Sequence, residues 1–263
     1  MDLKLVKRVG IAAAYKGQRV LLSHYLGGKS KVDKKGAIDL VTQADTESEK
    51  TIIGTIKNAF PDHMVLAEES GLNKGEADHK WIVDPLDGTT NFAHRLGLFA
   101  ISIAFVLSGD TVVAIVLSPI TRELFTAIKG KGAELNGRPI NVSNAQTVSE
   151  SLLVTGFPYN FIDEFNPLMT RFSNCLKASQ GVRRLGSAAM DLCFVACGRF
   201  DGFWEQNLKP WDTAAGELIA REAGATVTDF SNKPFDIYKN EILATNGNVH
   251  KEMLLLLALK DIA

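Results

Sequence analysis

Two short acidic segments in the first third of the chain contain the residues best suited to chemistry. They are Ala67–Ser70 and Trp81–Phe92, and each places carboxylates directly after an apolar run. Such a run predicts a buried strand, and carboxylates at the edge of a core are costly unless they are paired or bind a metal ion. Mg²⁺ prefers oxygen ligands and takes few of them from protein, which leaves room for water and phosphate. The two segments therefore indicate a Mg²⁺ site for phosphate ester chemistry.

The second segment also offers a place for an anion. Asp84 precedes Pro85, which keeps Asp84 extended at the end of the strand. The turn Asp87–Thr89 can begin a short helix over Thr90–His94. Backbone N–H groups at the N-terminus of that helix would face whatever lies between the two aspartates, and phosphate is the natural ligand there.

Each acidic residue has a simpler explanation when it is taken alone. Asp87 could lie in an acidic surface turn that only caps the helix. Glu68 and Glu69 could lie in a solvated loop, and only one of two adjacent strand side chains should face a site. Asp212, in the distant segment Lys209–Thr213, could serve only as a helix cap. A shared role requires the fold to bring these carboxylates together.

Taken together, the motifs resemble the inositol monophosphatase family of Mg²⁺-dependent, lithium-sensitive phosphatases, and the resemblance runs nearly end to end. It implies an α/β fold arranged as an α/β/α/β/α layered sandwich, commonly assembled as a homodimer. The matching pieces are Glu68–Ser70, Trp81–Phe92, Trp211-Asp212, Ile38–Thr42 with Asp45, and Arg183–Ala189 with Glu205.

Carried over position by position, the resemblance implies a set of ligands for two or three Mg²⁺ ions. These ligands are the carboxylates of Glu68, Asp84, Asp87 and Asp212 and the main-chain carbonyl of Leu86. A loop lysine is also expected near an extra ion, and both Lys34 and Lys35 qualify for that position.

The resemblance also implies roles in catalysis and substrate binding. Glu68, Thr89 and Asp45 are expected to be catalytic, with Asp45 orienting Thr89. Gly88 and Thr89 are expected to bind phosphate through their backbone N–H groups. The full set of residues expected to contact substrate is Glu68, Leu86, Asp87, Gly88, Thr89, Gly186, Ser187, Ala188, Glu205 and Asp212.

The sequence predicts a mechanism without a covalent intermediate, because no Ser or Cys stands in a convincing setting for a nucleophile. We predict direct attack by a water molecule activated by Mg²⁺, with Glu68 and Thr89 positioning the water and taking its proton. A second ion, bridged by the three aspartates, would neutralise the leaving alkoxide.

The substrate is expected to be a small phosphorylated polyol or sugar, with hydrolysis of myo-inositol 1-phosphate to myo-inositol and phosphate the leading prediction. The continuation Thr90–Arg95 favours it over phosphoadenosine phosphate, whose phosphatases usually carry Lys-Glu-Phe at this point, and over fructose 1,6-bisphosphate, whose phosphatases typically show a DGSSN motif. Both stay open as alternative substrates. A further alternative is a dimeric adaptor of the transcription machinery, with which bacterial relatives of this kind associate.

The composition argues against other classes of protein. The chain has 263 residues and a formal net charge of −1, whereas a nucleic-acid-binding domain is usually strongly basic. The aliphatic run Leu254–Leu257 is far too short to span a bilayer, and the N-terminus lacks the pattern of a signal peptide. Three cysteines without the spacing of a zinc site fit a reducing compartment. We therefore expect a cytoplasmic protein with a small partner and no membrane contact.

The elements that position these residues are predicted to form two halves. Residues 1–148 should form an α+β half that carries the acidic motifs, with an antiparallel meander from Leu98 to Ile128. Residues 149–263 should form an α/β half in which strands and helices alternate, and which supplies Asp212 and the substrate-side residues. The predicted helices are 3–26, 45–59, 165–178, 187–197, 212–223 and 248–260, and the predicted strands outside the meander are 38–42, 64–67, 80–84, 152–155, 181–184, 202–205 and 242–245.

Overall fold

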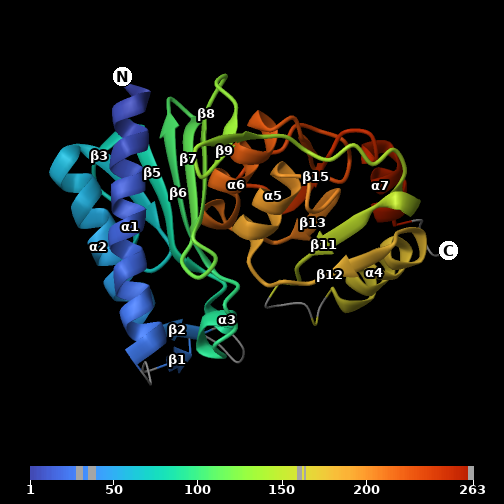
Figure 1. Cartoon of the computed structure of the whole chain (residues 1–263), viewed down its shortest axis with the longest axis horizontal. Helices are drawn as coiled ribbons and strands as arrows, with labels where there is room; N and C mark the ends of the chain where they lie inside the picture. Colours follow the sequence, from blue (N-terminus) through green and yellow to red (C-terminus); the bar gives the residue numbers. More distant parts are fainter. Residues whose placement is uncertain (28–31, 35–39, 159–161, 163, 260–263) are drawn as a thin grey trace.

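The structure is a computed structural model, and it describes residues 1–27, 32–34, 40–158, 162 and 164–259. Helices and sheets alternate across the molecule in five layers (Figure 1). The layers confirm the predicted α/β/α/β/α sandwich. In order they are α1 (Leu3–Gly27) with α2 (Gln43–Ala59), an eight-stranded sheet, α5 (Ala188–Ala196) with α6 (Pro210–Glu222), a five-stranded sheet, and α4 (Phe165–Ala178) with α7 (His250–Leu257).

The eight-stranded sheet is antiparallel except at one pair, where β3 and β5 run parallel. This exception matters because parallel neighbours end at the same edge of a sheet. In spatial order the strands are β10 (Arg138–Ile140), β9 (Ala133–Leu135), β8 (Glu123–Ile128), β7 (Asp110–Ser118), β6 (Ala100–Leu107), β5 (Glu76–Asp87), β3 (His63–Ala67) and β4 (Gly71–Asn73).

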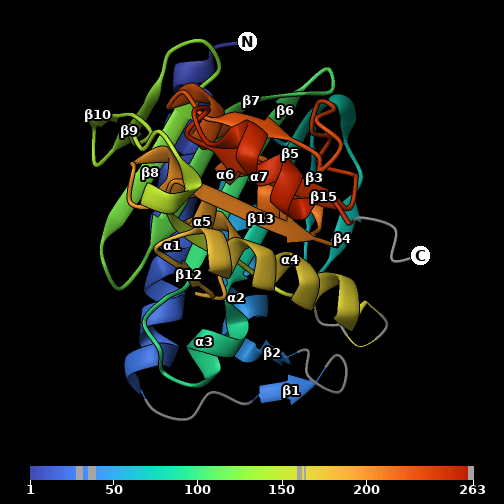
Figure 2. The ribbon, with the colours of Figure 1, turned by 90° about the vertical axis from the view of Figure 1, so that its right-hand side faces the viewer.

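The five-stranded sheet is mixed, with β11 parallel to both of its neighbours and β15 antiparallel to both of its own. Figure 2 shows α4 and α7 lying across its outer face. In spatial order the strands are β12 (Gly181–Arg183), β11 (Leu152–Thr155), β13 (Gly202–Gln206), β15 (Glu241–Thr245) and β14 (Thr226–Thr228).

Three small elements lie outside these layers. A hairpin of β1 (Val32–Lys34) and β2 (Leu40–Thr42) lies beside the one-turn helix α3 (Thr89–Ala93), as both views show (Figures 1 and 2). A short 3₁₀ helix spans Val148–Glu150 and leads into β11.

Helix α6 lies between the two sheets and joins their cores. Ala214, Ala215 and Ile219 are fully buried in a cluster that includes residues of both sheets. Gly216 allows a close approach to α5, since a Cβ there would lie 2.8 Å from the Cβ of Leu192. The small residues of α6 therefore let a helix enter the space between two sheets.

Several elements differ in length from their predictions. Strand β5 extends to Asp87, so the second acidic segment is more extended than expected. Helix α6 begins two residues before Asp212, because Pro210 fits the first turn of a helix. The three-residue strands β4 and β14 were not predicted, and the closing helix ends at Leu257. Of the strand predicted over 38–42, residues 38 and 39 lie outside the described residues.

Candidate active site

The two acidic segments meet because β3 and β5 are parallel neighbours. Ala67, the last residue of β3, pairs with Val83 of β5, so Glu68 follows β3 at the level of Asp84 in β5. The N–H of Glu68 donates to the carbonyl oxygen of Val83 at 3.2 Å. The sequence predicts two separate acidic segments after apolar runs. The register of the parallel pair β3 and β5 explains why the two segments lie side by side.

A bulge in β5 separates Asp84 from Asp87. Asp84 is opposite Ser102 of β6, but Asp87 is opposite Ala100, so β5 holds one extra residue between them. Pro85 lies in this interval and has no N–H to give to a ladder. Bulges of this kind redirect side chains and often lie beside active sites.

Asp84 is buried among other carboxylates. One of its oxygens accepts the N–H of Leu86 at 2.9 Å. Burial raises the pKa of Asp84 well above its usual value, and the negative charges of Glu68, Asp87 and Asp212 raise it further. These effects require the four carboxylates to lie close together, although they come from three separate parts of the chain.

Asp87 links the eight-stranded sheet to helix α5. Its Oδ2 accepts the hydroxyl of Ser187 at 2.6 Å and the N–H of Ala189 at 2.8 Å. Burial raises the pKa of Asp87 to about 6, and the hydrogen bonds from Ser187, Ala189 and Ala188 oppose that rise. Asp87 is therefore bound directly to the N-terminus of α5, about 100 residues further along the chain.

Asp212 acts as a helix cap and also lies within the acidic cluster. Its Oδ2 accepts the N–H of Lys209 at 2.7 Å in the first turn of α6. The carbonyl oxygen of Trp211 accepts the hydroxyl of Ser102 at 3.0 Å, which fastens this turn to β6. Burial raises the pKa of Asp212 well above its usual value, with further contributions from the charges of Asp87 and Glu68.

Thr89 lies in the turn after Asp87 and is bound to α2. Its Oγ1 lies 3.2 Å from Oδ1 of Asp45 and 3.0 Å from the carbonyl oxygen of Leu86. Both Thr89 and Asp45 are buried. The hydroxyl has a single hydrogen to donate, so it can donate to Asp45 or to Leu86 but not to both at once.

Gly88 is required by both its conformation and its surroundings. Its φ of +94° is in the left-handed region, which glycine adopts most readily. A Cβ there would also lie 3.1 Å from the carbonyl oxygens of Gly186 and Leu98. The structure thus brings the phosphate-binding turn predicted from sequence against the predicted substrate-side segment Gly186–Ala188.

The amide of Asn91 strengthens that contact, and sequence reasoning gave it no role. Its Nδ2 donates to the carbonyl oxygens of Leu98 at 2.7 Å and Leu185 at 2.8 Å. Ser187 is buried at the N-cap of α5. The predicted residues Gly186, Ser187 and Ala188 therefore lie beside the turn that contains Gly88.

Glu205 lies at the end of β13, near the acidic cluster. Burial and the negative charges of Asp212 and Asp87 together raise the pKa of Glu205 to about 8, against the opposing effect of Arg184. A Cβ on Gly156 would fall 2.1 Å from Oε2 of Glu205. A larger residue at position 156 would displace the Glu205 carboxylate, a contact that strand prediction around Leu152–Thr155 did not reveal.

Asp191 is a second residue that the sequence reasoning missed. It lies in the first turn of α5, and both of its carboxylate oxygens are buried without a hydrogen-bond partner. Burial raises its pKa well above the usual value, and the charges of Glu205 and Asp87 add to this. The only signal in the sequence is one acidic residue within the apolar stretch Ala188–Ala196.

The lysine expected near an extra ion is not placed by the structure. Lys35 lies outside the described residues, and for Lys34 only the backbone, at the end of β1, is described.

The donor set fits a hard divalent cation by its chemistry. The cluster consists of carboxylates whose pKa values are raised by burial and by their mutual repulsion, and a cation between them would offset both effects. As the side chains are placed, the described residues contain no group of three or more His, Cys, Asp or Glu arranged to hold a metal ion. The carboxylates share a region without meeting at one point.

Within the part of the chain that the structure describes, no helix combines the length and apolar character needed to cross a membrane.

Comparison with known proteins agrees with the motifs. The model of the inositol monophosphatase family matches residues 2–261. A Synechocystis protein named inositol-1-monophosphatase is 46% identical over 230 residues, covering 86% of this chain and 80% of the relative. Nus factor SuhB of Pseudomonas aeruginosa is 42% identical over 228 residues, covering 85% of this chain and 84% of the relative.

A solved structure gives the same result for the fold. The crystal structure of extragenic suppressor protein suhB from Bartonella henselae superposes with a TM-score of 0.93 at 40% sequence identity, covering 98% of this chain and all of the other. With the family match over nearly the whole length and the acidic cluster in place, the chain belongs to the inositol monophosphatase family and is a phosphatase.

Proposed function

We propose that the protein hydrolyses myo-inositol 1-phosphate to myo-inositol and phosphate in a reaction that depends on Mg²⁺. The observation that carries this proposal is the gathering of Glu68, Asp84, Asp87 and Asp212 around one buried region. Thr89 and the left-handed Gly88 lie directly beside it in sequence and space.

The residues that would hold two or three Mg²⁺ ions are these four carboxylates and the carbonyl oxygen of Leu86. Bound there, Mg²⁺ would supply Lewis-acid stabilisation of the phosphoryl group and lower the pKa of a water molecule. The Leu86 carbonyl oxygen lies 3.0 Å from the Thr89 hydroxyl, and when that hydroxyl donates to Asp45 instead, the lone pairs of the carbonyl oxygen are available to a cation.

Thr89, Asp45 and Glu68 would manage the proton of the attacking water. When the Thr89 hydroxyl donates to Asp45, 3.2 Å away, its lone pairs can accept from the water and orient it. The carboxylate of Glu68 would take the proton as the oxygen attacks phosphorus. Backbone N–H groups of Gly88 and Thr89 would bind the phosphate oxygens as negative charge builds on them.

The substrate's alcohol side would lie against Gly186, Ser187, Ala188 and Glu205. Glu205 would accept hydrogen bonds from hydroxyl groups of the polyol, for which a carboxylate offers several lone pairs. The absence of a side chain at Gly156 supports this role, because it leaves room for the carboxylate in its present position.

A substrate panel tests the proposal. Phosphate release from myo-inositol 1-phosphate, fructose 1,6-bisphosphate and phosphoadenosine phosphate should be measured with and without Mg²⁺. We expect turnover that requires Mg²⁺ and is highest for the inositol phosphate. Preferred hydrolysis of another member of the panel would reassign the substrate, and no Mg²⁺-dependent release from any of them would contradict the proposal.

A second function as a partner of the transcription machinery is favoured by one observation. The relative from Pseudomonas aeruginosa bears the name Nus factor SuhB and is 42% identical to this chain. Binding of purified RNA polymerase, measured with the wild-type protein and with an inactive Asp87→Asn variant, tests this role. Binding by both proteins would support an adaptor role separate from catalysis, and binding by neither would exclude it.

We also propose that the protein is a cytoplasmic homodimer, that Li⁺ inhibits it, and that the two halves meet near residue 148. The last point is supported by the division of strands, since β3–β10 form one sheet and β11–β15 the other. Light scattering at micromolar concentration would test the dimer, and a monomer would contradict it.

A further inference from the structure

The buried carboxylate of Glu49 has no role in the chemistry proposed above. Glu49 lies on α2 and is only 4% exposed. It accepts the N–H of Glu69 at 2.8 Å and the N–H of Ser70 at 2.9 Å, one with each oxygen. Since a buried carboxylate is costly unless its charge is compensated by strong hydrogen bonds, these two contacts are what make the position tenable.

The two amides belong to the turn that contains Glu68. Residues 68–70 connect β3 to β4, whose ends pair as Ala67 and Gly71. On its N-terminal side Glu68 is held by the hydrogen bond from its N–H to Val83. On its C-terminal side the next two N–H groups are held by Glu49. The backbone of Glu68 is therefore fixed from both directions.

Helix α2 touches the second acidic segment with the same face. Asp45, Ser48 and Glu49 are three and four residues apart, which places them together on a helix, and all three are buried. Asp45 lies 3.2 Å from the Thr89 hydroxyl, and the Ser48 hydroxyl donates to the carbonyl oxygen of Pro85 at 3.3 Å. One helix face thus supports both acidic segments.

We propose that Glu49 is a positioning residue that fixes the Glu68 turn and thereby sets the affinity of the site for Mg²⁺. The inference rests on the proposed function, which makes Glu68 a metal ligand. Its physical basis is geometric, because only a carboxylate of this length offers two acceptor oxygens to two adjacent amides. A glutamine has one acceptor oxygen, and its NH₂ group would face a second N–H donor.

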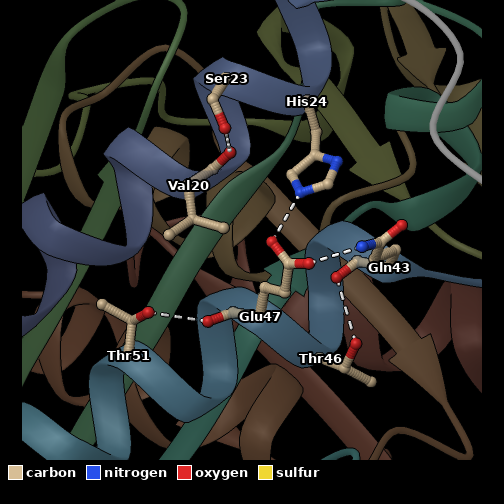
Figure 3. Close-up of polar contacts among 7 residues, drawn as sticks. All are labelled: Val20, Ser23, His24, Gln43, Thr46, Glu47 and Thr51. Atoms are coloured by element: carbon tan, nitrogen blue, oxygen red, sulfur yellow. Dashed lines mark hydrogen bonds and ion pairs between the residues drawn. The ribbon is translucent and has the colours of Figure 1, made fainter.

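Glu47 provides a matched control on the same helix. It lies two residues before Glu49 and is exposed to solvent. Figure 3 shows its carboxylate accepting from Gln43 at 2.6 Å and paired with His24 of α1 at 2.9 Å. Glu47→Gln removes the same charge from the same helix without touching the Glu68 turn.

The test compares Mg²⁺ binding to metal-free protein by isothermal titration calorimetry for the wild type, Glu49→Gln, Glu49→Asp and Glu47→Gln. We expect Glu49→Gln to weaken Mg²⁺ binding by roughly tenfold, the low end for residues that orient a metal ligand. Glu49→Asp keeps the charge but retracts the carboxylate by one methylene, so it should weaken binding too. Glu47→Gln should bind like the wild type, and the KM for substrate at saturating Mg²⁺ should be unchanged in all four proteins.

Three outcomes would overturn the inference. In the first, Glu49→Gln binds Mg²⁺ like the wild type. In the second, Glu49→Asp binds like the wild type while Glu49→Gln binds more weakly, which would assign the effect to charge and not to geometry. An equal loss in Glu47→Gln would also assign it to charge. A wild-type protein that binds no Mg²⁺ would instead contradict the proposed function, so the two failures are distinguishable.

A second measurement needs no variant and covers the case in which Glu49→Gln does not fold. Amide hydrogen exchange in metal-free wild-type protein should show the N–H groups of Glu69 and Ser70 protected relative to exposed turns such as Gly109. Exchange as fast as in those turns would show that Glu49 does not hold this segment, and would overturn the inference.

Discussion

The two sides of the candidate active site are built by different physical means. On the side of the eight-stranded sheet, Glu68 and Asp84 come together because β3 and β5 are parallel and in register. On the opposite side, Asp212 arrives on α6, in the helical layer packed against that sheet, and Glu205 arrives on β13, in the five-stranded sheet beyond that layer. The first arrangement follows from backbone pairing, whereas the second depends on how whole layers pack.

This difference shows which contacts hold the site together. The sheet side is fixed by ladder hydrogen bonds and by α2, so it should keep its shape when the other side is disturbed. The packed side is joined to it by few specific links, among them Asp87 to Ser187 and Ser102 to Trp211. Changes at these links should affect chemistry more than folding.

The largest effect is expected at Asp87, which belongs to both sides. Asp87→Asn keeps the size of the side chain but removes the charge that a cation would meet. Turnover should fall by on the order of 10²–10³-fold, while the far-ultraviolet circular dichroism spectrum stays unchanged. Near-normal turnover would refute the role given to Asp87.

A smaller effect, confined to the packed side, is expected from Gly156→Ala. The new Cβ would fall 2.1 Å from Oε2 of Glu205, so the carboxylate must move. We expect the KM for inositol phosphate to rise about tenfold while Mg²⁺ affinity stays the same. Gly54→Ala is the control, because nothing lies within 4 Å of a Cβ at that position. Equal kinetics for the two variants would remove Glu205 from substrate binding.

The stability of metal-free protein should fall as pH rises through the region where the cluster ionises. The pKa of Glu205 is about 8 in the folded protein, above a value of about 4.3 in the unfolded chain. The folded state therefore binds more protons in this window, and its advantage is lost as pH rises toward 8. Saturating Mg²⁺ should raise the melting temperature by roughly 5–10 °C, and more at pH 8 than at pH 5. A melting temperature indifferent to Mg²⁺ would count against the site.

The smallest effect is expected at the far end of β3, away from Glu68. His63 accepts the Trp81 indole N–H on Nδ1 at 3.1 Å, and burial lowers the pKa of His63. The unfolded chain takes up a proton on His63 below a pH of about 6.5, whereas the folded protein favours the neutral imidazole. The stabilisation that His63 contributes is therefore present above that pH and is lost as pH falls. His63→Gln should make this loss smaller, measured as the change in the free energy of urea unfolding between pH of about 7.5 and about 5. The control variant His94→Gln, at an exposed position, should leave the pH dependence of stability as in the wild type. Neither variant should change turnover.

The same contrast explains what the sequence could predict. The acidic strand ends Glu68 and Asp84 were visible locally, because each follows an apolar run. Asp212 was visible only through its resemblance to a family, since nothing in Lys209–Thr213 states which layer α6 enters. Glu49 lies in the polar stretch Thr46–Lys50, which is typical of a solvated helix face, and only its contact with the Glu69 and Ser70 amides distinguishes it.

The placement of Asp191 and Gly156 could not be predicted for a similar reason. The burial of Asp191 and the lack of room for a Cβ at Gly156 beside the Glu205 carboxylate both arise from neighbours distant in sequence. Short strands such as β4 and β14, of three residues each, also carry too little periodicity to be recognised.

Anomalous diffraction from crystals soaked in Mn²⁺, a substitute for Mg²⁺ that scatters strongly, would examine both sides of the site at once. We expect at least one peak within coordination distance of both Asp87 and Asp212, and another that includes Glu68 and Asp84. Peaks confined to the sheet side, with the Asp212 carboxylate still bound only to the Lys209 amide, would contradict the account.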